Sequence, residues 1–249
     1  MPATPSWPPR SAPRLFVEAP VAAGELVVIE GNPAHYLTRV MRVREGDAVI
    51  VCDDVTGEWA CRVVSADKRS VTLEPVEKLR PRESVPDIWL CPALLKKDRF
   101  DIVLEKATEL GVAAIHPVLA RRCVADKLNL DRARTVTTEA AEQCARTALP
   151  EIAAPRSLSA MLTKWPEDRA LFFADEQGGE HALRAFASHA GPAAILIGPE
   201  GGWDDAERDA IRAHPAARPV TLGPRILRGE TAALCALATW MSVSGDWQQ

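Results

Sequence analysis

A chain of 249 residues is long enough for one large domain or two modest ones, and a composition of 47% hydrophobic and 26% charged residues is typical of a globular protein. The net charge of −4 argues against a uniformly basic nucleic-acid binder, although the 30 Lys and Arg residues can still gather on one face. No apolar run approaches the ~20 residues of a membrane helix and no signal peptide is evident, so we expect a cytoplasmic protein that contacts no membrane.

The N-terminal part of the chain is predicted to be a small β domain. Residues 1–14 are rich in proline and are expected to be extended. Residues 32–43 have apolar positions at helical spacing, with Asn32 as N-cap and Pro33 at the first helical position. Short apolar runs bounded by turn residues predict strands at 25–30, 47–53, 58–66 and 70–76. We therefore expect a barrel-like β domain over residues 1–76.

Residues 77–87 are the best candidate for a linker, because they are charged, contain two prolines and lack periodicity. From residue 88 to residue 249, strands that are almost entirely apolar alternate with helices, which predicts a parallel sheet covered on both faces. The predicted strands cover 87–94, 112–119, 169–176, 193–200 and 218–223. The predicted helices cover 96–111, 130–147, 204–214 and 229–245.

Cysteine and histidine give no sign of a metal site. The six cysteines form no C-x-x-C pair, so a zinc site is not expected and most should be small core side chains. His116 stands at a predicted strand end before Pro117, where a structural role is favoured over a catalytic one.

Residues 198–202, Gly-Pro-Glu-Gly-Gly, follow a buried strand directly. Glycine lets a ligand approach the main chain closely, and ligands of open α/β sheets bind beyond the carboxyl ends of the strands. The loop matches neither the dinucleotide nor the P-loop fingerprint, and acidic residues follow it, which disfavours a triphosphate. A plain strand-to-helix turn is the alternative.

A second loop repeats this arrangement. Residues 222–224, Leu-Gly-Pro, end a predicted strand, and Arg225 and Arg228 then flank Ile226 and Leu227. Two such loops side by side would form a cleft whose main chain can recognise a small polar ring such as adenine, and arginine at this position suits phosphate or base contacts. The alternative is a charged turn with the two apolar side chains in the core.

Two groups of polar residues on predicted helices are less decisive. Glu139, Glu142, Gln143 and Arg146 share one helix face, which is usually solvated surface, although Gln143 and Arg146 could bind a base and a phosphate. Lys96, Lys97 and Arg99 lie at the start of the helix predicted over 96–111. They could contact phosphate, but three solvated cations are the simpler interpretation of their spacing.

Four segments, in this order, resemble the signature blocks of the RsmE family, the ribosomal RNA small-subunit methyltransferases E. They are FDIVLEKATELGV at 100–112, EAAEQCARTALPEI at 139–152, ILIGPEGGW at 195–203 and TLGPRILRGETAAL at 221–234. RLFV at 14–17 and HYLTRVMRVREGDAV at 35–49 also match, so the resemblance spans roughly residues 14–243. Gly229 departs from the usual Thr, and Trp203 stands where an aromatic residue or leucine is usual, from which we expect only local effects.

The resemblance implies an N-terminal PUA-like β-barrel domain and a C-terminal SPOUT methyltransferase domain with a trefoil knot, a topology that periodicity alone does not indicate. It also implies S-adenosylmethionine as methyl donor, a homodimer, and methylation of N3 of one uridine in 16S ribosomal RNA. Uracil N3 is buried by pairing in a duplex, so the target should be unpaired or flipped out.

The resemblance also assigns roles to residues. Arg228 is expected to stabilise negative charge on the uracil carbonyls, and Glu200 and Glu230 are candidates for the general base. The cofactor is expected to contact both glycine loops, at Leu196, Gly198, Glu200, Gly201, Gly202, Leu222, Gly223, Ile226 and Leu227. Apart from the resemblance, an acidic protein that binds RNA should depend on a local basic patch, for which the candidates are Arg10, Arg14, Arg39, Arg42 and Arg44. Gln143 and Arg146 are expected to orient the nucleotide across the dimer interface.

Two other classes of function stay open. A non-catalytic RNA-binding assembly factor would not need the full set of glycines together with Arg228. A hydrolase of adenine nucleotides would need a Lys-Ser/Thr pair or metal ligands, and neither is present in these loops.

Overall fold

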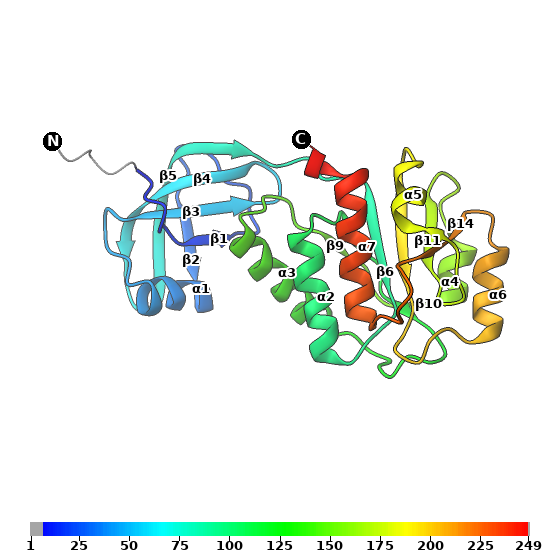
Figure 1. The fold of residues 1–249 in the computed structure, drawn as a ribbon. Helices are drawn as coiled ribbons and strands as arrows, with labels where there is room; N and C mark the ends of the chain where they lie inside the picture. Colours follow the sequence, from blue (N-terminus) through cyan, green and yellow to red (C-terminus); the bar gives the residue numbers. More distant parts are fainter. Residues whose placement is uncertain (1–6, 249) are drawn as a thin grey trace. The chain divides into compact units, whose positions relative to one another are not determined.

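The computed structural model describes residues 7–248, so residues 1–6 of the predicted extended segment lie outside the described part (Figure 1). Its contacts divide the chain into two compact units. The N-terminal unit runs to Ser84 and includes Ala141–Ala148, and the C-terminal unit holds Val85–Ala140 and the residues from Leu149 onward.

The N-terminal unit contains a five-stranded sheet in the order β1-β3-β4-β5-β2. Its strands are β1 (Arg14–Phe16), β2 (Val27–Glu30), β3 (Ala48–Asp53), β4 (Gly57–Ala66) and β5 (Ser70–Pro81). β1 and β3 are parallel, and the other neighbours are antiparallel. Shifts of register between β4 and β5 increase the local twist and curl the sheet around one apolar core. The predicted β domain is therefore present.

Two details of this unit differ from the prediction. The short helix α1 (Gly31–His35) has Glu30, not Asn32, as its N-cap, and it continues into a π-helical turn, η1 (Tyr36–Val40). Pro33 is thus the third helical residue, where its missing N–H has no partner to lose. β5 extends to Pro81, so the predicted linker is wrong for residues 77–81. These charged residues pair with β4, and Arg80 donates to Glu58 at 2.5 Å.

The C-terminal unit contains the predicted parallel α/β sheet, with seven strands in the order β12-β14-β11-β13-β6-β7-β9. These strands are β6 (Ile88–Pro92), β7 (Ala114–Ile115), β9 (Glu151–Ile152), β11 (Ala170–Ala174), β12 (Glu180–His181), β13 (Ala193–Ile197) and β14 (Ala217–Thr221). A second, two-stranded parallel sheet joins β8 (Val118–Leu119) and β10 (Arg156–Ser157). The strand predicted over 112–119 is split into β7 and β8, because Pro117 between them has no amide hydrogen for the ladder.

Helices cover both faces of this sheet. They are α2 (Lys97–Glu109), α3 (Leu130–Cys144), α4 (Leu158–Thr163), α5 (Ala182–Ala187), α6 (Asp205–Ala213) and α7 (Gly229–Val243), and a final 3-10 turn is η2 (Asp246–Gln248). In the central strand β13, Ile195 and Ile197 face the core formed with α2, α5 and α7. Ala194 and Leu196 face the opposite core, to which α4 and α6 contribute. This alternation decides which side chains can reach a ligand at the end of the strand.

Within residues 7–248, no helix has the length and apolar character needed to cross a membrane. In the same part of the chain, no cluster of three or more His, Cys, Asp or Glu side chains is arranged to hold a metal ion. The trefoil knot stays a prediction from the resemblance.

Candidate active site

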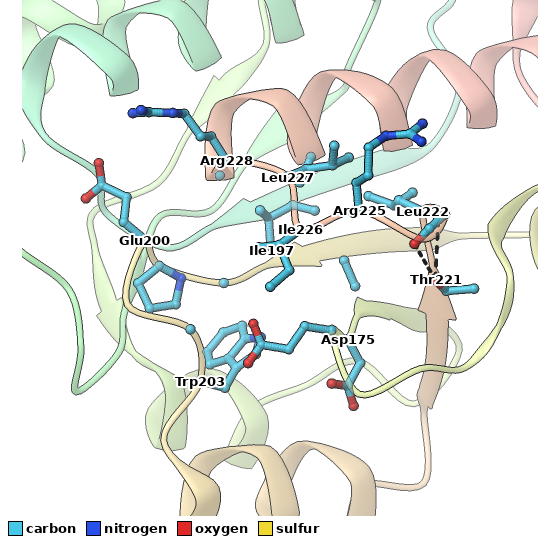
Figure 2. Close-up of a pocket in the computed structure, with 18 of the residues that line it drawn as sticks. Asp175, Ile197, Glu200, Trp203, Thr221, Leu222, Arg225, Ile226, Leu227 and Arg228 are labelled. Carbon is cyan, nitrogen blue, oxygen red and sulfur yellow. Dashed lines mark hydrogen bonds between the residues drawn. The ribbon is translucent and has the colours of Figure 1, made fainter.

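A pocket of about 370 Å³ lies beyond the carboxyl ends of β11, β13 and β14 (Figure 2). Three loops surround it, with residues from 174–176, 198–203 and 221–229, and the strand residues Ile197 and Val220, Arg99 of α2 and Ala232 of α7 complete the lining. The carboxyl ends of neighbouring parallel strands meet at one edge of a sheet, so the two predicted glycine loops come together here.

Gly198 is required by the side chain that packs on it. A Cβ atom at this position would lie 2.8 Å from Nε1 of Trp203, closer than real Cβ contacts come. Trp203 is only 2% exposed and packs edge-on against Phe173, with ring centroids 5.7 Å apart, so it has no room to yield. Among the described residues its buried Nε1 has no hydrogen-bond partner. The first glycine loop therefore follows the indole closely and leaves a polar atom at the pocket wall.

Two further acids at the pocket were not identified from the sequence. Asp175 is fully buried, and its Oδ2 accepts from Arg212 Nη2 at 2.6 Å. Glu176 accepts from Arg208 Nη2 at 2.6 Å, and Oε1 of Glu176 would lie 3.0 Å from a Cβ on Gly202. Gly202 has φ of 70°, which also favours glycine. The only sequence signal was a pair of acids directly after the strand over 170–174.

A second charged cluster connects the two glycine loops. Arg99 of α2 forms an ion pair with Glu200, and its Nε lies 3.8 Å from Oε1 of Glu230. In the described part of the molecule, the buried Oε2 of Glu230 accepts no hydrogen bond. Arg99 thus fixes the two carboxylates predicted as base candidates, a role that the sequence did not distinguish from a phosphate contact.

Arg228 is exposed at the pocket, directly before the first residue of α7. It forms no ion pair with any residue of 7–248, so it does not brace the turn through Glu230. Figure 2 shows Arg228 and Glu200 at the same end of the pocket, with Arg225 directed toward the other end. Ile226 is 88% exposed, which contradicts the alternative in which it is part of the core.

Comparisons with known proteins agree with this geometry. A family model described as an RNA methyltransferase domain matches residues 81–241, more than half of the chain, and one described as an RNA methyltransferase PUA domain matches residues 29–76. A ribosomal RNA small subunit methyltransferase E from Synechocystis is 34% identical over 235 residues, 91% of this chain and 74% of the relative. The chain belongs to the ribosomal RNA small subunit methyltransferase E family.

Further members of this methyltransferase family support the assignment. A relative with the same name from Bacillus subtilis is 30% identical and covers 84% of this chain and 87% of its own length. A crystal structure of a ribosomal RNA small subunit methyltransferase E from Neisseria gonorrhoeae, bound to S-adenosyl methionine, has a TM-score of 0.85 and 30% identity. It covers 95% of this chain and 99% of its own chain.

Most of the residues expected to bind the cofactor in a methyltransferase of this family line the pocket, namely Gly198, Glu200, Gly202, Leu222, Gly223, Ile226 and Leu227. Leu196 and Gly201 do not. Leu196 points into the core on the far face of β13, because side chains alternate along a strand. A Cβ on Gly201 would lie 3.1 Å from Cβ of Arg122, outside the pocket. Glu230 is also absent from the lining and reaches it only through Arg99.

The residues expected to contact RNA are placed unequally. Arg10, Arg39, Arg42 and Arg44 are exposed on the N-terminal unit, and the basic patch stays a prediction. Arg14 instead pairs with the buried Glu58, which ties it to the sheet.

The predicted helix face for RNA is wrong. α3 ends at Cys144, and Ala145 has φ of 61°, so Arg146 leaves the helix. Gln143 is exposed, whereas the Arg146 side chain is 4% exposed, with its Nε 3.9 Å from Glu83. Burial lowers the pKa of the Arg146 guanidinium, while Glu83 opposes this change. Arg146 therefore lies inside the N-terminal unit and not on a surface shared with Gln143.

Proposed function

We propose that this protein transfers a methyl group from S-adenosylmethionine to N3 of one uridine in 16S ribosomal RNA. The observation that carries the proposal is the pocket beyond β11, β13 and β14, in which two glycine loops meet an unpaired Arg228. The relatives named for ribosomal RNA methylation, and the S-adenosyl methionine in the Neisseria relative, support it.

The residues of the pocket fit this cofactor. A volume of about 370 Å³ lies within the range of roughly 300–1,000 Å³ that is usual for ligand pockets. The main chain of 198–202 and 222–227 would recognise the adenine, and Trp203 would offer its unpaired N–H. Glu176, which Arg208 holds at the wall, would accept hydrogen bonds from the ribose hydroxyls. S-adenosylmethionine would supply an electrophilic methyl group on a sulfonium.

The chain's own residues then prepare the uracil. Arg228 donates hydrogen bonds to a uracil carbonyl as N3 loses its proton, and it is available for this because it has no ion-pair partner among residues 7–248. Glu200 lines the pocket at the same end as Arg228, so it is the better placed of the two base candidates. Arg99 holds the Glu200 carboxylate in position through their ion pair.

The N-terminal unit is proposed to bind the RNA around the methylated site. Arg39, Arg42 and Arg44 are exposed next to three exposed side chains of the η1 region, Tyr36, Val40 and Met41. Guanidiniums beside an aromatic ring suit phosphates and unpaired bases. Arg10 can extend this patch, and Gln143 remains a candidate contact.

The protein is further proposed to act as a homodimer in the cytoplasm. Helix α7 has one charged residue, Glu230, and its outward positions include exposed Thr231, Cys235 and Ser242. A helix that is apolar on nearly all sides is usually buried on all sides. A second copy of α7 would cover this face.

Binding of radiolabelled S-adenosylmethionine, measured with and without small-subunit ribosomal RNA, tests the proposal against its rivals. A methyltransferase binds the cofactor and transfers label to the RNA. A non-catalytic assembly factor binds RNA without transfer, and an adenine-nucleotide hydrolase neither transfers label nor depends on RNA. Absence of transfer from an enzyme that binds both partners would overturn the catalytic assignment.

A further inference from the structure

A second hollow of about 110 Å³ lies on the α4 face of the C-terminal sheet. Trp89 of β6, His116 after β7 and the segment 164–166 after α4 form its walls. It shares no lining residue with the active-site pocket among residues 7–248. Trp89 precedes Pro92 by three positions, about 10 Å along β6, and Pro92 pairs with Ile197 of the active-site pocket. The two hollows are therefore separate, and Trp89 lies away from the strand end that borders the active-site pocket.

The walls of the second hollow are aromatic and held in place. The rings of Trp89 and His116 have centroids 4.2 Å apart, and Trp165 meets Trp89 edge-on at 6.2 Å. The guanidinium of Arg169 lies 3.7 Å from the Trp89 ring centroid, and the Trp165 indole donates to the Arg169 carbonyl at 2.8 Å. At about 110 Å³ this hollow is smaller than an apolar cavity of about 150 Å³ that accepts benzene, so a flat ring would enter its mouth and not be fully enclosed by its walls.

The charge of the lining selects an anionic ligand. Arg156 and Lys164 are exposed at the hollow, and neither forms an ion pair with a described residue. Within the described chain, no Asp or Glu side chain contributes to the lining. A flat apolar slot next to two free cations matches a ring that carries a phosphate.

His116 adds a polar group to the same walls. Its Nε2 is buried and has no hydrogen-bond partner in residues 7–248. Burial lowers the pKa of this imidazole, so the ring is neutral near pH 7 and can offer one donor and one acceptor. A buried polar atom without a partner is unfavourable, and a ligand edge that pairs with Nε2 would relieve this.

We propose that this second pocket holds one unpaired nucleotide of the RNA substrate, other than the one that is methylated. The base occupies the slot beside Trp89 and Trp165, its polar edge pairs with His116, and Arg156 and Lys164 bind the adjoining phosphates. The inference rests on the proposed function, since it takes RNA as the substrate. It assigns the C-terminal unit a share of RNA positioning in addition to the chemistry.

Removing the charges of Arg156 and Lys164, which form the rim of the second pocket, tests the phosphate contacts. The double variant Arg156→Ala/Lys164→Ala is compared with Arg184→Ala/Arg218→Ala, which removes two exposed cations of the same unit outside both pockets. The probe is a fluorescently labelled transcript of 16S ribosomal RNA, titrated at several salt concentrations. We expect the rim variant to lose affinity by about tenfold and its salt slope to fall by about 1.4, from two single-strand phosphate contacts. We expect the control to change by less than about twofold.

The slot is tested with Trp165→Ala and the conservative variant Trp165→Phe. Loss of one stacked base should weaken RNA binding at least about fivefold in Trp165→Ala, and Trp165→Phe should restore most of it. The KM for RNA should rise while the turnover at saturating RNA and the affinity for S-adenosylmethionine stay unchanged. A purely structural role of Trp165 would instead lower the melting temperature and the cofactor affinity together.

Two results would overturn the inference. One is a rim variant that binds RNA with the affinity and salt slope of the control. The other is a rim effect without any effect of Trp165→Ala, which would leave a phosphate contact and no base slot. Binding is measured without turnover, so a failure of methyl transfer by the unmodified protein would count against the proposed function and not against this pocket.

Discussion

Arg228 is the residue on which the proposed chemistry depends most. The structure leaves it exposed at the pocket, without an ion-pair partner among residues 7–248, at the same end as Glu200 (Figure 2). A guanidinium in this state can form new hydrogen bonds to a substrate oxygen without first breaking an internal pair.

We predict that Arg228→Ala lowers the single-turnover methylation rate by at least about 100-fold, as removal of one donor does in comparable oxyanion sites. Cofactor affinity and melting temperature should change little, because Arg228 braces nothing in the described structure. Arg228→Lys should also be impaired, since it keeps the charge but loses the planar fork. Arg225→Ala, directed toward the other end of the pocket, is the matched control. A near-normal rate for Arg228→Ala at saturating RNA would remove this residue from the chemistry.

Gly198 and Gly201 provide a second test at the residue scale. In Gly198→Ala the new methyl group would collide with the buried Trp203, so we expect about tenfold weaker S-adenosylmethionine binding and a loss of about 1–3 kcal/mol in stability. In Gly201→Ala the methyl group meets the Arg122 side chain of an exposed segment outside the pocket, so affinity should stay within about twofold. Calorimetric titration of both variants makes the comparison, and equal losses would contradict this assignment of the two glycines.

The ion pairs that sequence reasoning missed share a physical cause. Arg99 and Glu200 are 101 positions apart, and Arg208 and Glu176 are 32 apart, so nothing local indicates that they pair. The resemblance assigned Leu196 to the cofactor, whereas the period of two along β13 turns its side chain to the other face. The glycine loops themselves were predictable, because their position after apolar strands is a local property.

At the scale of elements, the parallel sheet followed from apolar strands alternating with helices, and its long elements match the predicted ranges closely. Boundaries were less predictable where tertiary contacts decide them. β5 continues through charged residues because β4 offers it a partner, and α3 stops before Arg146 because Ala145 adopts a left-handed conformation. Neither choice is encoded in hydrophobic periodicity.

The turn between β3 and β4 makes the N-terminal unit sensitive to acid. Burial raises the pKa of Asp53, but hydrogen bonds from Thr56 and from the amides of Val21 and Val55 outweigh it and hold the pKa below 3.8. The stabilisation is therefore complete above about pH 4 and is lost as the pH falls through the lower, folded-state pKa. Asp53→Asn should lose about 1–3 kcal/mol at pH 7 and show a smaller further loss from pH 5 to pH 3 than the unmodified protein.

Urea unfolding at pH 7, 5 and 3 measures this dependence. Glu45→Gln, an exposed carboxylate of the same unit, is the control and should follow the unmodified protein. If Asp53→Asn and the unmodified protein lose the same stability between pH 5 and pH 3, the hydrogen-bonded carboxylate is not the source of the acid sensitivity.

The proposal that the protein is a dimer rests on helix α7. Cys235→Arg would place a charge in the middle of its uncharged outward face, and we expect it to convert the dimer to a monomer, because an unpaired charge is strongly unfavourable in a buried interface. Cys235→Ser should remain dimeric. Light scattering coupled to size-exclusion chromatography gives both masses. A monomeric unmodified protein, or a dimeric Cys235→Arg, would contradict the role of this face.

At the scale of the whole molecule, the chemistry is proposed to reside in the C-terminal unit, and RNA recognition to be shared between the two units of one chain. The division was predicted in outline from a change of sequence pattern near residue 77, but a cut after residue 76 would pass through β5. The segment Ala141–Ala148 also belongs to the N-terminal unit although it follows most of α3. Such a return of the chain has no local signal, because it depends on contacts between distant segments. The intact chain is therefore the right material for testing function.

The most direct test of the central claim is to identify the nucleoside that the intact protein methylates. Unmodified 16S ribosomal RNA is incubated with the protein and S-adenosylmethionine carrying a deuterated methyl group, digested to nucleosides and analysed by liquid chromatography and mass spectrometry. We predict label in 3-methyluridine alone, at one site per RNA molecule, with at least about 100-fold slower labelling by Arg228→Ala. Label in any other nucleoside, or no label in RNA that the protein binds, would contradict the account.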